Sequence, residues 1–309
     1  MAHVAHEPFV LASGTRIPRC IYGTAEKKDA GLLFDAIKAG FRGLDSAAQP
    51  QSYDEEVVGE AIRTALDPPE LGGLGLRRED LYVQTKFTTP RGQDFSSGKA
   101  PYDPEDPIPI KVSKSIEFSL RKLGVTWVDT LLLHGPMPTV AETLEVWKAF
   151  ESLVPHRTRN LGLSNVSLQE IESVCAEATI VPAVVQNRFL PRTRYNTDVR
   201  TFCVSRNINY QAFSIMRSNH HLLADNIVGW LAERTGSTRQ EALFALVLSL
   251  GSNHSVLIGT KDSTKATSDL MAINRLGKVP DFVQQGFLEI LDQAAAQYTA
   301  IHANHSIPA

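Results

Sequence analysis

Four side chains that can carry or exchange protons follow one another along the chain: Asp45, Tyr53, Lys86 and His134. Each lies near the end of a short apolar run or in the loop directly after one. Carboxylate, phenol, ammonium and imidazole groups are those that proteins use in general acid and base catalysis. A buried ammonium requires a partner, and Asp45 is the available acid. The pattern therefore points to proton-transfer chemistry.

The sequence around Lys86 and His134 favours this interpretation over an ordinary structural role. A lone lysine at a strand end is more often a solvated cap, and a lone histidine is more often a structural group. Lys86 lies in "YVQTKF", however, and His134 follows "TLLL". Such near-continuous apolar runs are typical of strands that are buried on both faces.

Eight short runs rich in β-forming residues alternate with amphipathic helical patterns, which is typical of a parallel sheet built from strand–helix units. Several of the helical patterns end at a glycine that suits a helix C-terminus. The predicted strands are 19–23, 42–45, 81–87, 127–134, 158–164, 183–189, 208–214 and 255–259.

Eight such units in one chain predict an α/β fold of the (β/α)₈ TIM-barrel type, with residues 1–309 as a single domain. A doubly wound sheet would carry a glycine-rich loop after its first strand, and the chain has none there. The segment "FVLASGTRIP" predicts an N-terminal hairpin that closes the barrel floor. Residues 88–107 form the one long irregular segment, and we expect a mobile loop on the substrate side. In this fold the strand ends bring the four proton-carrying residues to one rim.

Composition narrows the class of partner. The formal net charge is −3, and lysines and arginines are scattered, so we expect no nucleic-acid partner. No signal peptide or bilayer-length apolar run is visible, so we expect a cytoplasmic protein without a membrane partner. The three cysteines show neither CxxC spacing nor a short Cys/His pattern, so we expect no disulfide framework and no metal site. A small molecule is the expected partner.

Six motifs in consistent order make the chain resemble the aldo-keto reductases over nearly its whole length. They are "GTRIP…YGT" (14–24), "AIKAGFRGLDSA…Y.EE.VGEAI" (36–62), "LYVQTKF" (81–87), "VDTLLLHGP" (128–136), "LGLSN" (161–165) and "VVQNRF" (184–189). The resemblance implies a (β/α)₈ barrel that reduces carbonyl compounds with NADPH. The loop "AAQPQS" before Tyr53 matches the subset of the family with "QP..Y" in its catalytic loop.

The resemblance also assigns roles to residues of this chain. Tyr53 would donate the proton, Lys86 would lower the pKa of that tyrosine, Asp45 would hold the lysine, and neutral His134 would orient the carbonyl oxygen. The implied cofactor-binding residues are Gly23, Thr24, Asp45, Ser164, Asn165, Gln186, Phe213, Ser214, Gly259, Thr260, Lys261, Lys265 and Asp269. In this set Lys261 and Lys265 would hold the 2′-phosphate, and Phe213 replaces the usual stacking tyrosine.

The resemblance says less about which residues contact the substrate. The expected contacts are Tyr22, Phe87, Phe95 and Tyr102, and Tyr22 is also the alternative proton donor. The sequence does not name the carbonyl substrate, and the expected assembly is a monomer or weak dimer. Two other functions remain open: a cofactor-binding regulatory or redox-sensing barrel with little turnover, and a metal-dependent barrel hydrolase, suggested only by "NHH" at 219–221.

Overall fold

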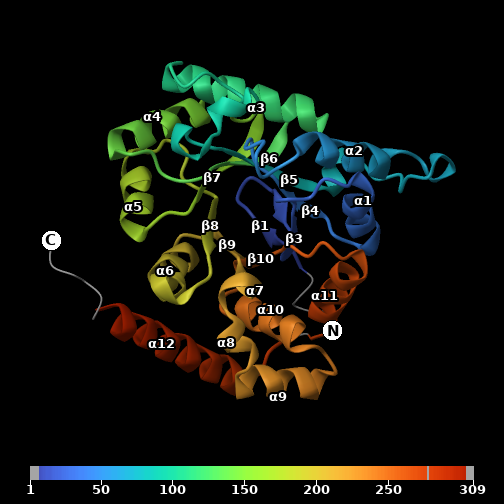
Figure 1. The fold of residues 1–309 in the computed structure, drawn as a ribbon, viewed down its shortest axis with the longest axis vertical. Helices are drawn as coiled ribbons and strands as arrows, with labels where there is room; N and C mark the ends of the chain where they lie inside the picture. Colours follow the sequence, from blue (N-terminus) through green and yellow to red (C-terminus); the bar gives the residue numbers. More distant parts are fainter. Residues whose placement is uncertain (1–6, 277, 304–309) are drawn as a thin grey trace.

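The computed structural model describes residues 7–276 and 278–303. Eight parallel strands form a closed barrel in the order β10-β3-β4-β5-β6-β7-β8-β9, surrounded by helices (Figure 1). The predicted barrel and its eight strands are confirmed. The strands are β3 (Cys20–Gly23), β4 (Gly43–Asp45), β5 (Tyr82–Phe87), β6 (Val128–Leu133), β7 (Thr158–Ser164), β8 (Val184–Arg188), β9 (Asn209–Phe213) and β10 (His254–Ile258).

The helices begin at polar caps that the sequence supplies. Thr139, Ser167 and Thr238 each form a capping box with the glutamate three residues later, which satisfies free amides of the first turn. The helices of the ring are α1 (Ala30–Ala39), α2 (Glu55–Leu66), α3 (Ile108–Leu123), α4 (Val140–Glu151), α5 (Leu168–Glu177), α6 (Thr197–Ser205), α10 (Arg239–Ser249) and α11 (Ser263–Leu276). Three further helices follow β9, namely α7 (Ile215–Ser218), α8 (His220–Leu223) and α9 (Asn226–Thr235), and α12 (Asp281–Ala303) packs outside the ring against α9.

Alternation along the strands decides which side chains enter the barrel. In β5, Tyr82, Gln84 and Lys86 face inward, because Tyr82 joins the floor cluster and the other two bond to Asp45. The residues between them, such as Phe87, face the helices and belong to the main hydrophobic cluster. The barrel interior therefore has an apolar floor, a polar middle layer and a charged mouth.

The predicted N-terminal hairpin is present at the floor. β1 (Phe9–Val10) pairs antiparallel with β2 (Arg16–Ile17). Leu11 and Ile17 pack against inward side chains at the start of the barrel strands, including Tyr82 and Val184. This contact removes apolar surface from water and closes the barrel from below.

The segment 88–107 contains two short turns, η3 (Pro90–Gly92) and η4 (Phe95–Ser97). Tyr102 is buried, stacks on Phe87 and donates a hydrogen bond to the carbonyl of Thr88. The Phe95 ring packs edge-on against Tyr102. The buried Tyr102 therefore faces the helix layer and not the mouth, which contradicts its prediction as a substrate contact. The role of the half-exposed Phe95 stays a prediction.

In the part of the chain that the structure describes, no helix combines the length and apolar character needed to cross a bilayer.

Candidate active site

The centre of the barrel mouth is a buried ion pair. The Lys86 Nζ donates to both carboxylate oxygens of Asp45, at 2.7 and 2.8 Å, and to the carbonyl of Ser46 at 2.7 Å. Both side chains are almost fully buried. All three ammonium protons are thus used, which is what a buried lysine requires to remain charged.

Tyr53 lies above this pair and faces His134. The Lys86 Nζ is 5.2 Å from the centroid of the Tyr53 ring, and the Tyr53 and His134 ring centroids are 6.1 Å apart in an edge-on arrangement. Tyr53 directly precedes Asp54, whose side chain caps α2, so the helix start fixes its backbone. The structure therefore brings the four predicted catalytic residues together.

Burial and charge act in opposite directions on Tyr53. Burial raises the pKa of its phenol, while the Lys86 charge opposes that rise by favouring the phenolate. Burial also acts against the Lys86 charge, but Asp45 and Tyr53 outweigh it and raise the pKa of the ammonium. The phenol is therefore protonated at neutral pH and lies beside a cation that stabilises its conjugate base.

His134 is neutral at physiological pH. Burial lowers the pKa of its imidazole to about 3, and the Lys86 and Arg188 charges act in the same direction. The Nδ1 atom lies 2.8 Å from the Thr88 hydroxyl. A neutral imidazole that accepts this hydrogen bond at Nδ1 carries its proton on Nε2, where it is a donor.

Three glutamines form an amide layer beneath Asp45 that the sequence analysis did not identify as a unit. Gln84 and Gln186 each donate to Asp45 Oδ1, at 2.6 and 2.9 Å, and both also donate to Gln211. Gln211 returns a hydrogen bond to Gln84 at 3.0 Å. The sequence feature that could have identified this layer is the position of each glutamine on the inward face of its strand, β5, β8 or β9. The layer holds the Asp45 carboxylate in a fixed orientation.

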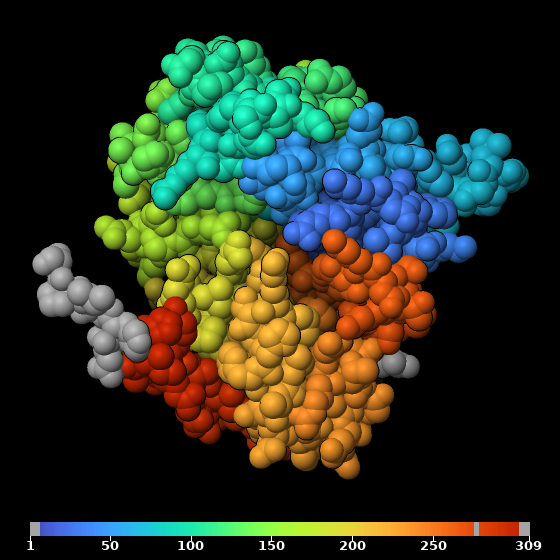
Figure 2. Space-filling model, in the orientation of Figure 1, coloured from blue at the N-terminus to red at the C-terminus, as the bar shows by residue number. Residues whose placement is uncertain are grey.

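A cavity of about 410 Å³ opens beside Tyr53, between the ends of β3, β9 and β10. Figure 2 shows this face hollowed between a blue segment near the start of the chain and an orange one near its end. Its lining combines the Phe213 ring with Lys27, Lys261 and Lys265. The predicted cofactor residues that line it are Gly23, Asp45, Phe213, Ser214, Gly259, Thr260, Lys261, Lys265 and Asp269.

The other predicted cofactor residues, Thr24, Ser164, Asn165 and Gln186, do not line this cavity. Thr24 is buried and donates its hydroxyl hydrogen to the Asp45 carbonyl. The Asn165 amide donates to the carbonyl of His134 and to the Ser164 hydroxyl. The Gln186 amide nitrogen is fully used by Asp45 and Gln211, so only its amide oxygen could accept a bond from a nicotinamide.

Lys27 is a cavity residue that the sequence analysis missed. Its Nζ donates to the carbonyls of Gly23 and Gly259, at 2.6 and 3.1 Å, and the side chain is buried. Burial, reinforced by the Lys261 charge, lowers the pKa of Lys27 to about 8. The sequence signal was a lysine two residues after the "GTA" turn, which by itself resembles an ordinary exposed residue.

Lys261 and Lys265 lie at the same cavity with two acids nearby. Lys261 forms an exposed ion pair with Glu26 at 3.4 Å. Asp269 is buried, and burial raises its pKa to about 6 although the Lys265 charge opposes the shift. The positive charges of Lys261 and Lys265 are thus only partly balanced by the two acids. Their ammonium groups can donate hydrogen bonds to the phosphates of a dinucleotide.

Tyr22 and Phe87 are not substrate contacts, and this corrects the prediction. Tyr22 is fully buried on the outer face of β3, packs against Phe41 and donates its hydroxyl hydrogen to the Thr260 carbonyl. Phe87 contacts Phe150 of α4 and lies on the opposite face of β5 from Lys86. Strand alternation places both rings among the helices and away from the mouth.

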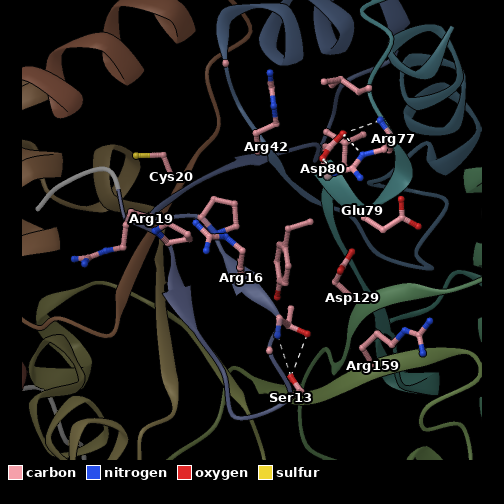
Figure 3. A pocket seen from close by; sticks show the side chains of 18 of the residues that line it. Ser13, Arg16, Arg19, Cys20, Arg42, Arg77, Glu79, Asp80, Asp129 and Arg159 are labelled. Atoms are coloured by element: carbon pink, nitrogen blue, oxygen red, sulfur yellow. Dashed lines mark hydrogen bonds and ion pairs between the residues drawn. The ribbon is translucent and has the colours of Figure 1, made fainter. Parts of the chain in front are cut away.

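A larger cavity, about 1090 Å³, lies at the opposite end of the barrel (Figure 3). It is lined by the hairpin and by residues at the start of the strands, such as Cys20 and Tyr82. Its arginines and acids include pairs such as Arg77 with Asp80, 2.8 Å apart. None of the four proton-carrying residues lines it, so its size does not make it the active site.

The family assignment follows from comparison with known proteins. The model of the Aldo/keto reductase family matches residues 23–224, more than half of the chain. The chain belongs to the aldo/keto reductase family. It is an oxidoreductase, as the reductases among its relatives are, and the family uses nicotinamide cofactors.

Two curated relatives illustrate the similarity. The D/L-glyceraldehyde reductase of Hypocrea jecorina is 28% identical over an alignment of 317 positions, gaps included, that covers 87% of this chain and 87% of the relative. The NADPH-dependent codeinone reductase 1-4 of Papaver somniferum is 30% identical over 230 residues, which cover 67% of this chain and 64% of the relative.

A solved structure agrees on the fold. The aldo/keto reductase from Brucella melitensis superposes with a TM-score of 0.73 at 22% identity, covering 93% of this chain and 99% of that one.

The "NHH" segment has local roles in this aldo/keto reductase. The Asn219 amide donates to the carbonyls of Phe189 and Ile215, and His221 lies 3.0 Å from the Tyr195 hydroxyl. Within residues 7–276 and 278–303, no three His, Cys, Asp or Glu side chains are grouped to hold a metal ion.

Proposed function

We propose that this aldo/keto reductase reduces an aldehyde or ketone to an alcohol with NADPH, and that Tyr53 donates the proton. The observation that carries the proposal is the buried Lys86–Asp45 pair directly beneath the Tyr53 ring, with neutral His134 facing the same space. A bound reduced nicotinamide supplies the hydride.

The side chains at the barrel mouth orient the carbonyl group and supply the proton. His134 donates a hydrogen bond from Nε2 to the carbonyl oxygen and holds it near Tyr53. As negative charge develops on that oxygen, the Tyr53 hydroxyl transfers its proton to it, and Lys86 stabilises the phenolate left behind. Asp45 and the amide layer keep the ammonium in position, so little reorganisation is needed during the transfer.

The cavity residues support NADPH as the cofactor. Phe213 offers a ring face for the nicotinamide beside Tyr53. Lys261 and Lys265 lie after β10 and can hold a 2′-phosphate, and Lys27 lines the same cavity. Ser164, Asn165 and the Gln186 oxygen remain candidates for the carboxamide.

The loop 88–107 contributes by positioning Tyr53. The Gln49 and Gln51 side chains both donate to the Gly92 carbonyl, at 2.7 and 2.6 Å, and the Gln93 amide donates to the Ala48 carbonyl at 2.6 Å. The residues of the "QP..Y" loop that precede Tyr53 are therefore held by the segment 88–107. Mobility of this segment, a monomeric or weakly dimeric state and a cytoplasmic location remain predictions.

A direct test measures oxidation of NADPH and of NADH by the purified protein with a panel of aldehydes and ketones, together with equilibrium binding of both cofactors. We expect turnover with at least one carbonyl and tighter binding of NADPH. Tight cofactor binding without turnover of any carbonyl would favour the regulatory barrel instead.

A further inference from the structure

Arg188 is the outermost inward-facing residue of β8. Side chains two residues apart in a strand share a face. Val184 belongs to the floor cluster and Gln186 bonds to Asp45 inside the barrel, so Arg188 occupies the next level, at the mouth. It is paired in register with Phe213, and its guanidinium carbon lies 5.3 Å from the Phe213 ring centroid.

The Arg188 charge acts on both groups that would contact the carbonyl. It opposes the rise that burial causes in the pKa of the Tyr53 phenol, and it adds to the lowering of the His134 imidazole pKa, as the Lys86 charge also does. Asp45 neutralises Lys86, however, and His134 carries no charge. Arg188 is therefore a positive charge beside Tyr53 and His134 in addition to the paired Lys86.

Arg188 forms no ion pair with a carboxylate within residues 7–276 and 278–303. It lines an adjoining cavity of about 490 Å³ that also contains Glu170 and Asp198. Glu170 caps α5 through Ser167, and Asp198 accepts the backbone amide of Val199. Both acids of this cavity are thus engaged elsewhere, and Arg188 is exposed and available.

We propose that Arg188 binds a carboxylate of the substrate, so that the substrates are aldehydes or ketones that also carry an acid group. This inference rests on the proposed carbonyl reduction at Tyr53. A guanidinium can hold a carboxylate through two parallel hydrogen bonds, and Arg188 lies at the same end of the barrel as Tyr53 and His134. The adjoining cavity provides space for the rest of such a molecule.

Two aldehydes of similar shape test the assignment: 4-carboxybenzaldehyde, which is anionic, and 4-nitrobenzaldehyde, which is neutral. In Arg188→Met we expect kcat/KM for the anionic aldehyde to fall on the order of 10- to 100-fold relative to the neutral one. Using the ratio removes any effect that Arg188 has on both substrates through the pKa of Tyr53. Arg188→Lys should keep part of the preference for the anionic aldehyde. Arg121→Met, which changes an exposed arginine of α3 that lines neither cavity, should keep all of it.

An unchanged ratio in Arg188→Met would overturn the carboxylate site. Equilibrium titration of 4-(hydroxymethyl)benzoate into the protein with saturating NADP⁺ gives a readout without turnover. Binding at least about tenfold tighter to the wild type than to Arg188→Met supports the site, and equal binding refutes it. A wild type that shows this difference but reduces neither aldehyde would support the anion site while overturning the proposed function. Loss of NADPH binding in Arg188→Met would assign Arg188 to the cofactor and refute the inference.

Discussion

The two ends of the barrel use charged residues in opposite ways. At the floor, the Arg19 guanidinium donates to three backbone carbonyls, Arg42 donates to two, and Arg78 pairs with Asp129 at 2.9 Å. At the mouth, Lys86 is paired with Asp45, yet Arg188 has no acidic partner among the described residues. The floor cavity is the larger of the two, but most of its donors are engaged in holding the structure. The functional end of the barrel is therefore marked by side-chain donors that are free to bind a ligand, and not by the larger cavity.

The largest expected difference in kcat is between variants that lack one cation at the mouth and variants that lack one at the floor. Lys86→Met removes the cation beside Tyr53, so we expect kcat to fall on the order of 10²- to 10⁴-fold. It also leaves Asp45 buried without its cation, which should lower the free energy of unfolding by about 3–5 kcal/mol.

The matched variant at the floor is Arg78→Met, which leaves Asp129 without its cation. Here we expect a stability loss of about 1–3 kcal/mol and normal turnover, measured by denaturant unfolding and NADPH oxidation. Normal turnover in Lys86→Met, or a large loss of turnover in Arg78→Met, would remove the distinction between the two ends.

Cofactor choice is the next largest effect. Lys261→Ala combined with Lys265→Ala should weaken NADPH binding on the order of 10- to 100-fold while changing NADH binding little, because only NADPH carries the 2′-phosphate. Fluorescence titration with both cofactors measures the difference. An equal change for the two cofactors would mean that these lysines face solvent and that the 2′-phosphate lies elsewhere.

The hydrogen bonds between the loop that carries Tyr53 and the segment 88–107 predict a smaller loss of kcat. Gln49→Ala together with Gln51→Ala removes two hydrogen bonds to Gly92 and loosens the loop that carries Tyr53. We expect kcat to fall by roughly tenfold, the cost of about one or two hydrogen bonds, with NADPH affinity unchanged. Hydrogen exchange of residues 88–107 should rise in the same variant. If kcat stays at the wild-type value, the segment 88–107 does not position Tyr53.

Lys27 gives the smallest effect and a characteristic pH dependence. Its pKa of about 8 means that it is charged at neutral pH and becomes neutral as the pH rises through that value. Since a phosphate binds the charged form, NADPH affinity should decrease a few-fold between pH 7 and pH 9.5. Lys27→Met should abolish this dependence, and an unchanged slope in the variant would show that another group titrates.

The same lysine links pH to stability. Burial depresses the pKa of Lys27, so between about pH 8 and its ordinary value near 10.5 the unfolded chain binds more protons than the folded one. The contribution of Lys27 therefore makes the free energy of unfolding rise with pH across that window, and Lys27→Met should remove this contribution.

The strand ends could be predicted from the sequence because each catalytic residue follows a run whose length and apolar character mark a buried strand. Lys27 could not, because its position depends on the meeting of the first and last strand ends when the barrel closes. The inward direction of Arg188 follows from strand alternation, but its lack of an acidic partner in the described part of the chain does not. Gln211 meets Gln84 only through barrel closure. The incorrect substrate contact Phe87 has a simple cause: once Lys86 faces inward, its neighbour must face outward.

The central claim is that Tyr53 donates the proton, and Tyr53→Phe tests it most directly. The variant loses only the hydroxyl, so NADPH binding by fluorescence titration should be nearly unchanged while carbonyl turnover falls on the order of 10²- to 10⁴-fold. Tyr22→Phe is the matched control, because the Tyr22 hydroxyl bonds to a backbone carbonyl outside the barrel interior, and it should keep its turnover at saturating NADPH. Near wild-type turnover in Tyr53→Phe, or a loss confined to Tyr22→Phe, would contradict the assignment of Tyr53.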